Sequence, residues 1–442
     1  MIKVISVSIG GFRNIKSTKI LFSNITTLLA DNNYGKTNVI DALKFAFEYI
    51  GNVPKGRVEM MKWAKGIPMN SKLLEEPFHF EIEIENDMLP KHRYIKYGFK
   101  FDWLNKNSNV VVDGRITDEY IETRATTSVK YTSFLKRDLG RYRQGKGTTS
   151  FKKIRLDDNV LSIDILEFQF DEEISHVAKI IKNVKMSVCG FDDSVEVFNK
   201  SFNGIDEIET RLLWNIIIPQ IIFDLRETDN KRYSLLLESI YDLFPEIISM
   251  EVKSAKITDK STDVIRVGDF GESIVMDSEV SLIPYNGMYR LMVKSRHLNH
   301  PVDISRMSFG TKRIIWFLVS LFTAKSKGVS IIAIEGLEAS VHPKIFRGLL
   351  EIVSSLSKEV SIIITSYSPL IIQYLKPESL YIGKRNQEGY ATFSAIEYKK
   401  VAQIRHVSMK MGMSFGEYIF DALVDDLNGP SIIDAILEDN DD

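Results

Sequence analysis

The residues best suited to chemistry form the run ADNNYGKT at residues 30–37. This run, called the phosphate loop below, follows a short β-prone stretch and precedes a helical pattern at residues 39–47, which is the context that phosphate binding requires. Backbone N–H groups at the start of such a helix surround phosphate oxygens. Lys36 would reach the β- and γ-phosphates, and the Thr37 hydroxyl would bind Mg²⁺. Ala30 replaces the usual first glycine, and the alternative is a turn in which a lone lysine leads into a helix.

A second group of residues, MSFGTKR at 307–313, places a serine and a glycine at the start of a predicted helix. A helix N-terminus attracts anions because its first N–H groups have no partner within the helix. The alternative for Ser308 is an ordinary structural helix cap.

Two predicted buried strands, at residues 329–334 and 360–365, each end in polar residues. Glu335 closes the first strand and Glu338 follows three residues later, where α/β sheets bind their ligands. These acids could hold a metal and orient an attacking water. The alternative is two solvated loop glutamates beside a structural His342. The Ser/Thr cluster after the second strand is by itself a turn.

In this order, the four elements resemble the prokaryotic ABC/SMC-like AAA ATPases related to the OLD (overcoming lysogenization defect) proteins. An opening strand with a Phe-Arg-x-Ile element precedes the phosphate loop in that family, and Phe12, Arg13 and Ile15 match it here. The family's loop-and-helix pattern is matched by Asn32, Asn33, Gly35, Lys36, Thr37, Asn38, Asp41, Ala42 and Leu43. Its signature and its acidic element are matched by Ser308, Gly310, Arg313, Glu335, Glu338, His342 and Pro343. The resemblance covers about residues 1–100 and 290–385.

The resemblance implies ATP and Mg²⁺ as ligands. It assigns nucleotide binding to Arg13, Asn32, Asn33, Gly35, Lys36, Thr37, Asn38, Ser308, Gly310 and Tyr367. Thr37 and Glu335 would hold the metal, and Glu335 and Glu338 are the candidate catalytic residues. In this class, the signature serine of one subunit caps the γ-phosphate bound by another, so a head-to-tail homo-oligomer is expected.

The chain departs from the family at two positions. Gly336 stands where a second acid usually follows the first, and Tyr367 stands where a histidine is usual. One interpretation is an ATP-gated clamp with slow hydrolysis, which we favour. The other is that Glu338 supplies the catalytic carboxylate. ATPase activity is therefore left open.

These elements predict an α/β fold: an ABC/SMC-like ATPase head with a mixed and parallel sheet, a mostly helical insert and a small C-terminal interaction element. Residues 78–85, FHFEIEIE, alternate with the strand period. Helices are expected near 205–222, 231–243, 308–323 and 342–356. The predicted boundaries are 1–100 and 291–385 for the two lobes of the head, 101–290 for the insert and 386–442 for the C-terminal element.

Composition limits the remaining possibilities. A hydrophobic fraction of 44% and a net charge of −2 are typical of a soluble globular protein that is not a polycation. The single cysteine, Cys189, excludes an internal disulfide and fits a reducing cytoplasm. We expect no signal peptide, no membrane span and a cytoplasmic location.

Residues 130–155 contain nine Lys or Arg residues and one acid, Asp138. Nine phosphate contacts to DNA or RNA would make binding strongly salt-dependent. This segment supports a nucleic-acid clamp in repair or replication; a solvated hairpin or a partner-docking surface is the alternative.

The resemblance instead favours the ATPase subunit of an anti-phage system such as Septu or PARIS, because no nuclease-like extension follows residue 385. In that role the chain would hold and release a separate nuclease. A transporter's ATPase subunit is a third, less favoured possibility.

Overall fold

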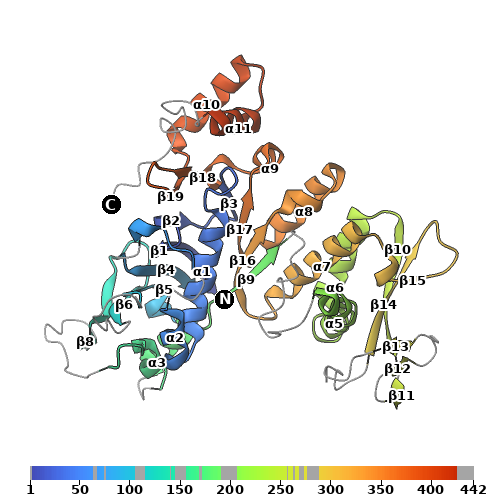
Figure 1. The fold of residues 1–442 in the computed structure, drawn as a ribbon, viewed down its shortest axis with the longest axis horizontal. Helices are drawn as coiled ribbons and strands as arrows, with labels where there is room; N and C mark the ends of the chain where they lie inside the picture. Colours follow the sequence, from blue (N-terminus) through green and yellow to red (C-terminus); the bar gives the residue numbers. More distant parts are fainter. Residues whose placement is uncertain are drawn as a thin grey trace. The chain divides into compact units, whose positions relative to one another are not determined.

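The computed structural model describes residues 2–62, 67–73, 76–104, 115–139, 141–144, 156–168, 172–190, 207–255, 257–261, 264–267, 273–275 and 288–425 (Figure 1). The chain divides into two compact units. The first comprises Met1–Val188, Lys325–Glu338 and Ser357–Asp442, and the second comprises Cys189–Ala324 and Ala339–Leu356. Each is described by itself.

The centre of the first unit is a set of parallel strands that carries the phosphate loop. Strands β18 (Leu380–Arg385), β3 (Ile25–Leu29), β17 (Ser361–Ser366) and β16 (Val329–Glu335) lie in that order. All residues of β3 and β17 are buried, as expected for parallel strands covered on both faces. The buried strands predicted at 329–334 and 360–365 are therefore confirmed.

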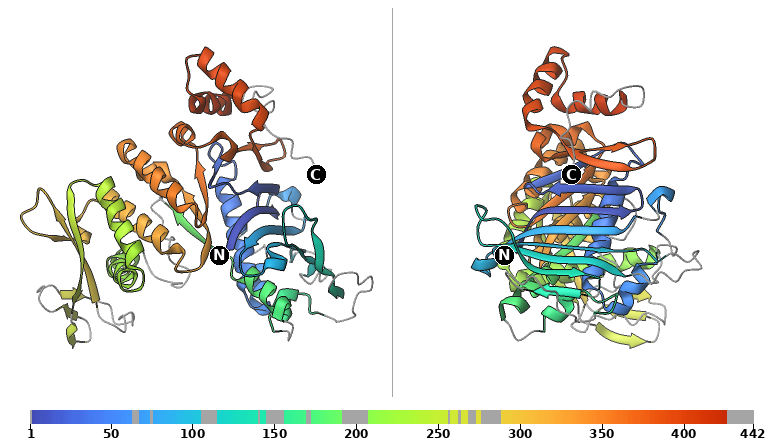
Figure 2. Two further views of the ribbon diagram at one scale, coloured as in Figure 1. Left: turned by 180° about the vertical axis from the view of Figure 1, so that it is seen from behind. Right: turned by 90° about the vertical axis from the view of Figure 1, so that its left-hand side faces the viewer.

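Strands in mostly antiparallel pairs extend the same sheet on one side of β18 (Figure 2). Beyond β19 (Ala391–Ala395) and β2 (Ile15–Leu21), the order continues through β1, β4, β5, β6, β7 and β8. Their bounds are Ile2–Phe12, Phe78–Asn86, Tyr94–Phe101, Ile116–Arg124, Thr132–Asp138 and Arg141–Gln144. The predicted alternation of β4 is confirmed, because its Phe and Ile residues are buried while its glutamates face the other side. Strand β9 (Lys185–Gly190) closes the far edge next to β16.

Helix α1 (Lys36–Gly51) follows β3 and packs on an aromatic cluster. The Phe45 and Phe78 rings lie 5.0 Å apart, and the Tyr49 and Phe101 rings stack at 4.9 Å. Ring pairs at such distances add to the large apolar area that aromatic residues bury. This core holds the helix that starts at the phosphate loop.

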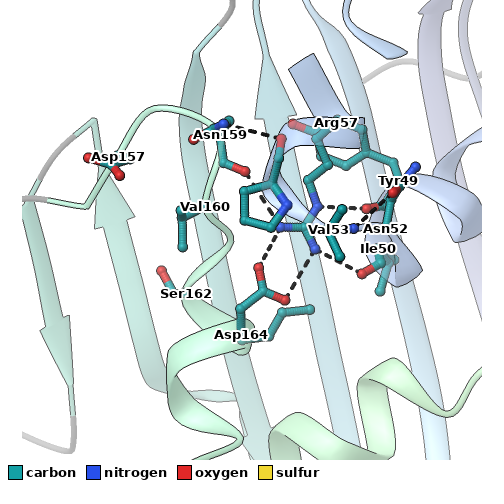
Figure 3. A network of polar contacts seen from close by, with 12 residues as sticks. Tyr49, Ile50, Asn52, Val53, Arg57, Asp157, Asn159, Val160, Ser162 and Asp164 are labelled. Carbon is teal, nitrogen blue, oxygen red and sulfur yellow. Dashed lines mark hydrogen bonds and ion pairs between the residues drawn. The ribbon is translucent and has the colours of Figure 1, made fainter. Parts of the chain in front are cut away.

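A buried arginine donates hydrogen bonds to the C-terminal end of α1 (Figure 3). Arg57, in α2 (Pro54–Met60), is fully buried and donates hydrogen bonds to the carbonyl oxygens of Tyr49 at 2.8 Å and Ile50 at 3.0 Å. Those carbonyls belong to the last turn of α1, where acceptors have no partner within the helix. Both guanidinium NH₂ groups also bond to Asp164 of α3 (Ser162–Leu166). The end of α1 is thereby tied to a segment more than 100 residues away in the sequence.

Segment 101–290, predicted as a mostly helical insert, supplies more strand than expected. Its first described part forms β6–β8 within the main sheet, followed by α3 and α4 (Glu172–Lys182). The reason is visible in β6, whose sequence ITDEYIETR buries residues at the strand period.

The second unit combines helices with two small sheets. Its helices are α5 (Glu207–Thr228), α6 (Asn230–Leu243), α7 (Phe309–Ala324) and α8 (Pro343–Leu356). The last three match predicted helices to within one residue at each end, whereas α5 continues six residues beyond its predicted end at 222. One sheet contains β10 (Ile247–Ala255), β14 (Met288–Ser295) and β15 (Val302–Asp303). The other contains β11 (Ile257–Ser261), β12 (Val264–Val267) and β13 (Ser273–Val275).

The C-terminal helices belong to the core of the first unit. Helices α9 (Pro369–Tyr374), α10 (Tyr398–Lys410) and α11 (Phe415–Asp425) lie beside β18 and β19 (Figure 1). Ile404 of α10 and Ile419 of α11 share a buried cluster with Leu29 and Leu380. Of the predicted C-terminal element, residues 386–425 thus pack against the sheet, and residues 426–442 lie outside the described residues. No helix in the described part of the chain is long and apolar enough to cross a membrane.

Candidate functional site

The phosphate loop joins β3 to α1 through a turn that requires glycine. Gly35 has a φ of 102°, a left-handed conformation that favours glycine. A Cβ atom there would also lie 3.0 Å from the Asn14 side chain and from Ala391. Gly35 precedes the first helical residue and offers no side-chain cap, and the first turn of α1 contains no acid. The first N–H groups of the helix are therefore available to donate hydrogen bonds to an anion.

The Lys36 side chain bonds back to the start of the phosphate loop. Its Nζ donates hydrogen bonds to the carbonyl oxygens of Ala30 at 2.6 Å and Asp31 at 2.9 Å. An ammonium group has three donors, so one remains for a ligand. Burial lowers the pKa of Lys36, while the nearby Asp31 and Glu338 carboxylates oppose that shift. A half-buried cation with one unused donor is suited to bind a phosphate oxygen.

Arg13 bonds to the N-terminal half of α1, and its assignment to nucleotide binding stays a prediction. Its Nη1 donates to Asn38 Oδ1 at 2.9 Å and to Asp41 Oδ2 at 2.5 Å. Asn38 in turn donates to Asn14 Oδ1 at 2.7 Å. The two predicted residues Arg13 and Asn38 are thus brought together, and Asn14 joins them, a role that our sequence reasoning did not assign. The Phe-Arg-x-Ile element is the signal that could have indicated it.

The two candidate catalytic acids, Glu335 and Glu338, lie at the carboxyl ends of the parallel strands, where the phosphate loop also begins. Glu335, the last residue of β16, pairs with Thr365 of β17, and Thr365 pairs with Leu28 of β3. Because the three strands are parallel, their carboxyl ends share one edge. Gly336 directly follows with a φ of 63°. This left-handed conformation favours glycine at the position.

Glu338 connects this edge to the end of β17. Its Oε1 accepts hydrogen bonds from Ser366 Oγ at 2.8 Å and from the Tyr367 backbone N–H at 3.1 Å. Its Oε2 is buried, without a hydrogen-bond partner among the described residues. The Tyr367 ring lies 5.9 Å from Lys36 Nζ, within the range of a cation–π contact. Lys36, Glu338 and Tyr367 therefore form one cluster.

The remaining loop candidates are exposed. Asn32, Asn33 and Thr37 all have exposed side chains, so the Thr37 hydroxyl is accessible to a metal ion. No cluster of three or more His, Cys, Asp or Glu residues that could hold a metal occurs within the described ranges. Mg²⁺ usually takes only one or two protein carboxylates and completes its shell with phosphates and water. The assignment of Thr37 and Glu335 to Mg²⁺ stays a prediction.

The signature residues lie in the second unit, at the start of α7. Ser308 Oγ accepts the Thr311 N–H at 3.2 Å, so Ser308 does act as the helix cap considered from the sequence. Ser308 remains exposed, and a Cβ at Gly310 would meet no atom within 4 Å. His342 Nδ1 accepts the Lys344 N–H at 3.2 Å at the start of α8, which supports its structural interpretation. The assignment of Ser308 and Gly310 to nucleotide binding stays a prediction.

The structure corrects the count of nine phosphate contacts in segment 130–155. Arg137 is fully buried and donates to the carbonyl oxygens of Leu139 at 2.7 Å and Asp157 at 3.2 Å. It also lies 3.6 Å from the buried Glu119 carboxylate. Arg137 therefore cannot reach a phosphate. Lys130, Lys136, Arg141 and Arg143 lie on or beside β7 and β8, and the other four basic residues lie outside the described residues.

Comparison with known proteins gives a family match over most of the chain. The model of the AAA ATPase domain family matches residues 2–372. No curated protein matches the chain.

Similar solved structures are SMC head domains. An Smc head bound to the C-winged helix domain of ScpA is 13% identical, with a TM-score of 0.49 over 91% of this chain and 99% of that one. An Smc head with an extended coiled coil from Pyrococcus furiosus is 13% identical, with a TM-score of 0.48 over 92% and 100%. The SMC head domain from Thermotoga maritima is 11% identical, with a TM-score of 0.41 over 89% and 99%.

Proposed function

Because the chain belongs to the AAA ATPase domain family, we propose that it binds ATP at the phosphate loop and hydrolyses it slowly. The observation that carries this proposal is the position of Lys36, which closes the loop through Ala30 and Asp31 and keeps one donor for a phosphate. The N–H groups at the start of α1 would bind the remaining phosphate oxygens. Asn32, Asn33 and Asn38 would line the same site.

Thr37 and Glu335 would hold Mg²⁺. When bound, Mg²⁺ supplies positive charge that neutralises the phosphate oxygens during transfer. The Thr37 side chain is exposed at the start of α1, and Glu335 lies two strands away at the same sheet edge. A hydroxyl and a carboxylate are both oxygen ligands of the kind that Mg²⁺ prefers.

Slow turnover is supported by the residues near the expected position of the attacking water. Gly336 removes one carboxylate from this edge, and Tyr367 takes the place of a histidine. Besides the expected metal ligand Glu335, Glu338 is the other acid there, and its Oε2 is buried without a hydrogen-bond partner among the described residues. A carboxylate oxygen in this position can accept a proton or orient a water. We favour nucleotide binding with slow hydrolysis; the alternative is that Glu338 supplies the catalytic carboxylate.

We propose that two copies meet head to tail across ATP. Ser308 and the adjacent helix start of one copy would contact the γ-phosphate held by Lys36 of another. The exposed Ser308 and the open space around Gly310 support this arrangement, because a phosphate could approach the N-terminus of α7.

For the cellular role, we propose the sensor and scaffold subunit of a prokaryotic anti-phage complex in the cytoplasm, which holds and releases a separate nuclease. The ordered resemblance of the four motifs supports this proposal.

The second candidate is an ATP-gated nucleic-acid clamp. Lys130, Lys136, Arg141 and Arg143 around the β7–β8 hairpin favour it. Co-purification of the tagged chain from its native host separates the two roles: a nuclease protein supports the first, and bound nucleic acid supports the second.

Equilibrium nucleotide binding tests the ATP site itself. Lys36→Ala should weaken ATP binding at least about 100-fold, since a partly buried site then lacks its charge-assisted hydrogen bond to phosphate. Lys44→Ala, on the same helix, is the matched control and should bind ATP normally. Unchanged affinity in Lys36→Ala would remove the assignment of the phosphate loop.

A further inference from the structure

A buried carboxylate holds the segment that leads into the signature residues at the start of α7. Asp303, the last residue of β15, is 9% exposed, and the short helix η6 (Ile304–Arg306) directly follows it. Its Oδ1 accepts the Ser305 N–H at 2.9 Å, and its Oδ2 accepts Arg290 Nε of β14 at 2.8 Å. One side chain thus joins the sheet of β10, β14 and β15 to the segment that precedes Ser308.

Ser305, within that segment, is held on both sides. Its N–H donates to Asp303, and its carbonyl oxygen accepts Lys312 Nζ of α7 at 3.1 Å. Ile304 is fully buried, and its carbonyl oxygen accepts the Met307 N–H at 3.0 Å. These contacts restrain the backbone immediately before the signature residues.

Asp303 is suited to this role because it is an ionised group with two strong donors. Burial opposes its ionisation, yet hydrogen bonds from Ser305 and Arg290 hold the pKa of Asp303 below its ordinary value. The Arg290 side chain is itself only 18% exposed. Hydrogen bonds between charged groups are about twice as strong as those between neutral ones, and breaking a buried pair of this kind is costly.

The position of Ser308 depends on the backbone before it. Among the described residues, Ser308 Oγ bonds only to Thr311, within the same helix. We propose that Asp303 is a positioning residue for Ser308, and that it links β14 to the place where the signature serine meets a γ-phosphate bound by a second copy. This inference rests on the proposed head-to-tail pairing. A displacement of about 1 Å in such a group can reduce turnover about 100-fold.

Hydrogen exchange of the full chain, followed by mass spectrometry, tests the contact without nucleotide. In Asp303→Asn, the peptide covering residues 304–312 should exchange about tenfold faster, since a hydrogen bond to a charged acceptor contributes about that factor. Arg290→Gln removes the link to β14 but keeps Asp303, and should have the same effect. Glu251→Gln, at a largely exposed acid of the neighbouring strand β10, is the matched control. Natural exchange of this peptide in both test variants would overturn the proposal.

Mixtures of two variants test whether Asp303 acts on a second copy. Asp303→Asn alone should lower steady-state turnover about 10- to 100-fold, while ATP still binds normally at Lys36 of dilute protein. An equal mixture with Lys36→Ala should recover about a quarter of natural turnover, because half of the pairs are mixed and each mixed pair has one intact site of two. Ser308→Ala mixed with Lys36→Ala is the matched control and should recover the same fraction. A variant that merely loses its fold would not be rescued in this way.

The outcomes distinguish a failure of this inference from a failure of the proposed function. Natural turnover in Asp303→Asn beside a loss in Ser308→Ala would overturn the positioning role and leave the head-to-tail pairing in place. Recovery in the Ser308→Ala mixture but not in the Asp303→Asn mixture would also overturn it, since Asp303 would then act within its own copy. Natural turnover in Ser308→Ala alone would overturn both proposals.

Discussion

Glu338 accepts the backbone N–H of Tyr367 at 3.1 Å, so the loop after β16 is fixed to the loop after β17. The same carboxylate oxygen also accepts the Ser366 hydroxyl. The Tyr367 ring in turn lies 5.9 Å from Lys36 Nζ. A change at any one of these three residues should therefore be transmitted to the others through direct contacts.

The first prediction concerns Glu338 and Glu335. Glu338→Gln keeps an oxygen that can accept the Ser366 and Tyr367 hydrogen bonds, but it removes the basic carboxylate. Turnover should fall about 100-fold or more, the usual contribution of general-base catalysis, while ATP affinity changes little. Glu335→Gln should instead raise the Mg²⁺ concentration needed for ATP binding, since it removes a carboxylate that holds the metal.

Steady-state phosphate release and ATP titrations at several Mg²⁺ concentrations distinguish these effects. Glu351→Gln, on the exposed surface of α8, is the control. Natural turnover in both variants would exclude an essential role for either carboxylate.

How much of this site could be predicted from the sequence depends on how far apart along the chain the interacting residues lie. The phosphate loop and the acids at and after the end of β16 were predicted because each is a local pattern at the end of a buried strand. The contact of Glu338 with Tyr367 was not, because it joins residues 29 positions apart across two strands. The contacts of Arg13 were missed for the same reason, since its partners Asn38 and Asp41 lie 25 and 28 positions away.

In the fold too, elements with a local sequence pattern could be predicted, whereas pairings between distant segments could not. Strict alternation predicted β4, and long apolar runs predicted β16 and β17. The insertion of β19 between β2 and β18 has no local signature, because it depends on pairing with residues more than 300 positions earlier. Arg137 was counted among nine phosphate contacts, yet it is fully buried beside Glu119, a partner 18 positions away in the sequence.

The second prediction concerns the anchor of α1. Asp164→Asn leaves the Arg57 guanidinium buried without its counter-charge, which should destabilise the fold by about 3 kcal/mol. Urea unfolding measures this as a lower midpoint with an unchanged slope. Glu388→Gln removes an exposed ion pair with Lys72 and should change stability little. A midpoint for Asp164→Asn that matches the Glu388→Gln control would show that the network in Figure 3 contributes no net stability.

The third prediction concerns the β7–β8 hairpin. If this segment binds DNA or RNA, charge reversal at Arg141, Arg143 and Lys146 should reduce the slope of log affinity against log salt by about 2 to 3, or somewhat under one for each phosphate that the variant no longer neutralises. Fluorescence anisotropy with a labelled duplex between low and moderate salt measures that slope. Lys399→Glu, far away in the sequence on α10, is the charge control. Absence of binding at low salt in the natural protein would eliminate the nucleic-acid clamp.

The fourth prediction concerns pH and His79. Its ring lies against Gly10, where a Cβ atom would be 2.3 Å from Cε1, and its Nε2 lies 3.4 Å from Ser17 Oγ. Burial, and secondarily the charge of Lys100, lowers the pKa of His79 below its ordinary value of 6.5. In the unfolded chain His79 takes up a proton near that ordinary value, so the folded state loses relative stability as pH falls through it and down to the lower folded pKa.

The expected result is that the free energy of unfolding of the natural protein decreases between pH 7 and pH 5 more steeply than that of His79→Gln. The difference in slope should not exceed about 1.4 kcal/mol per pH unit, the value for one proton. Urea unfolding at half-unit pH steps measures both curves, and subtracting them removes the contribution of every other titrating group. His297→Gln, at an exposed position of the second unit, is the control and should leave the natural pH dependence in place. Parallel curves for the natural protein and His79→Gln would mean that the imidazole takes up its proton as readily in the fold as in the unfolded chain.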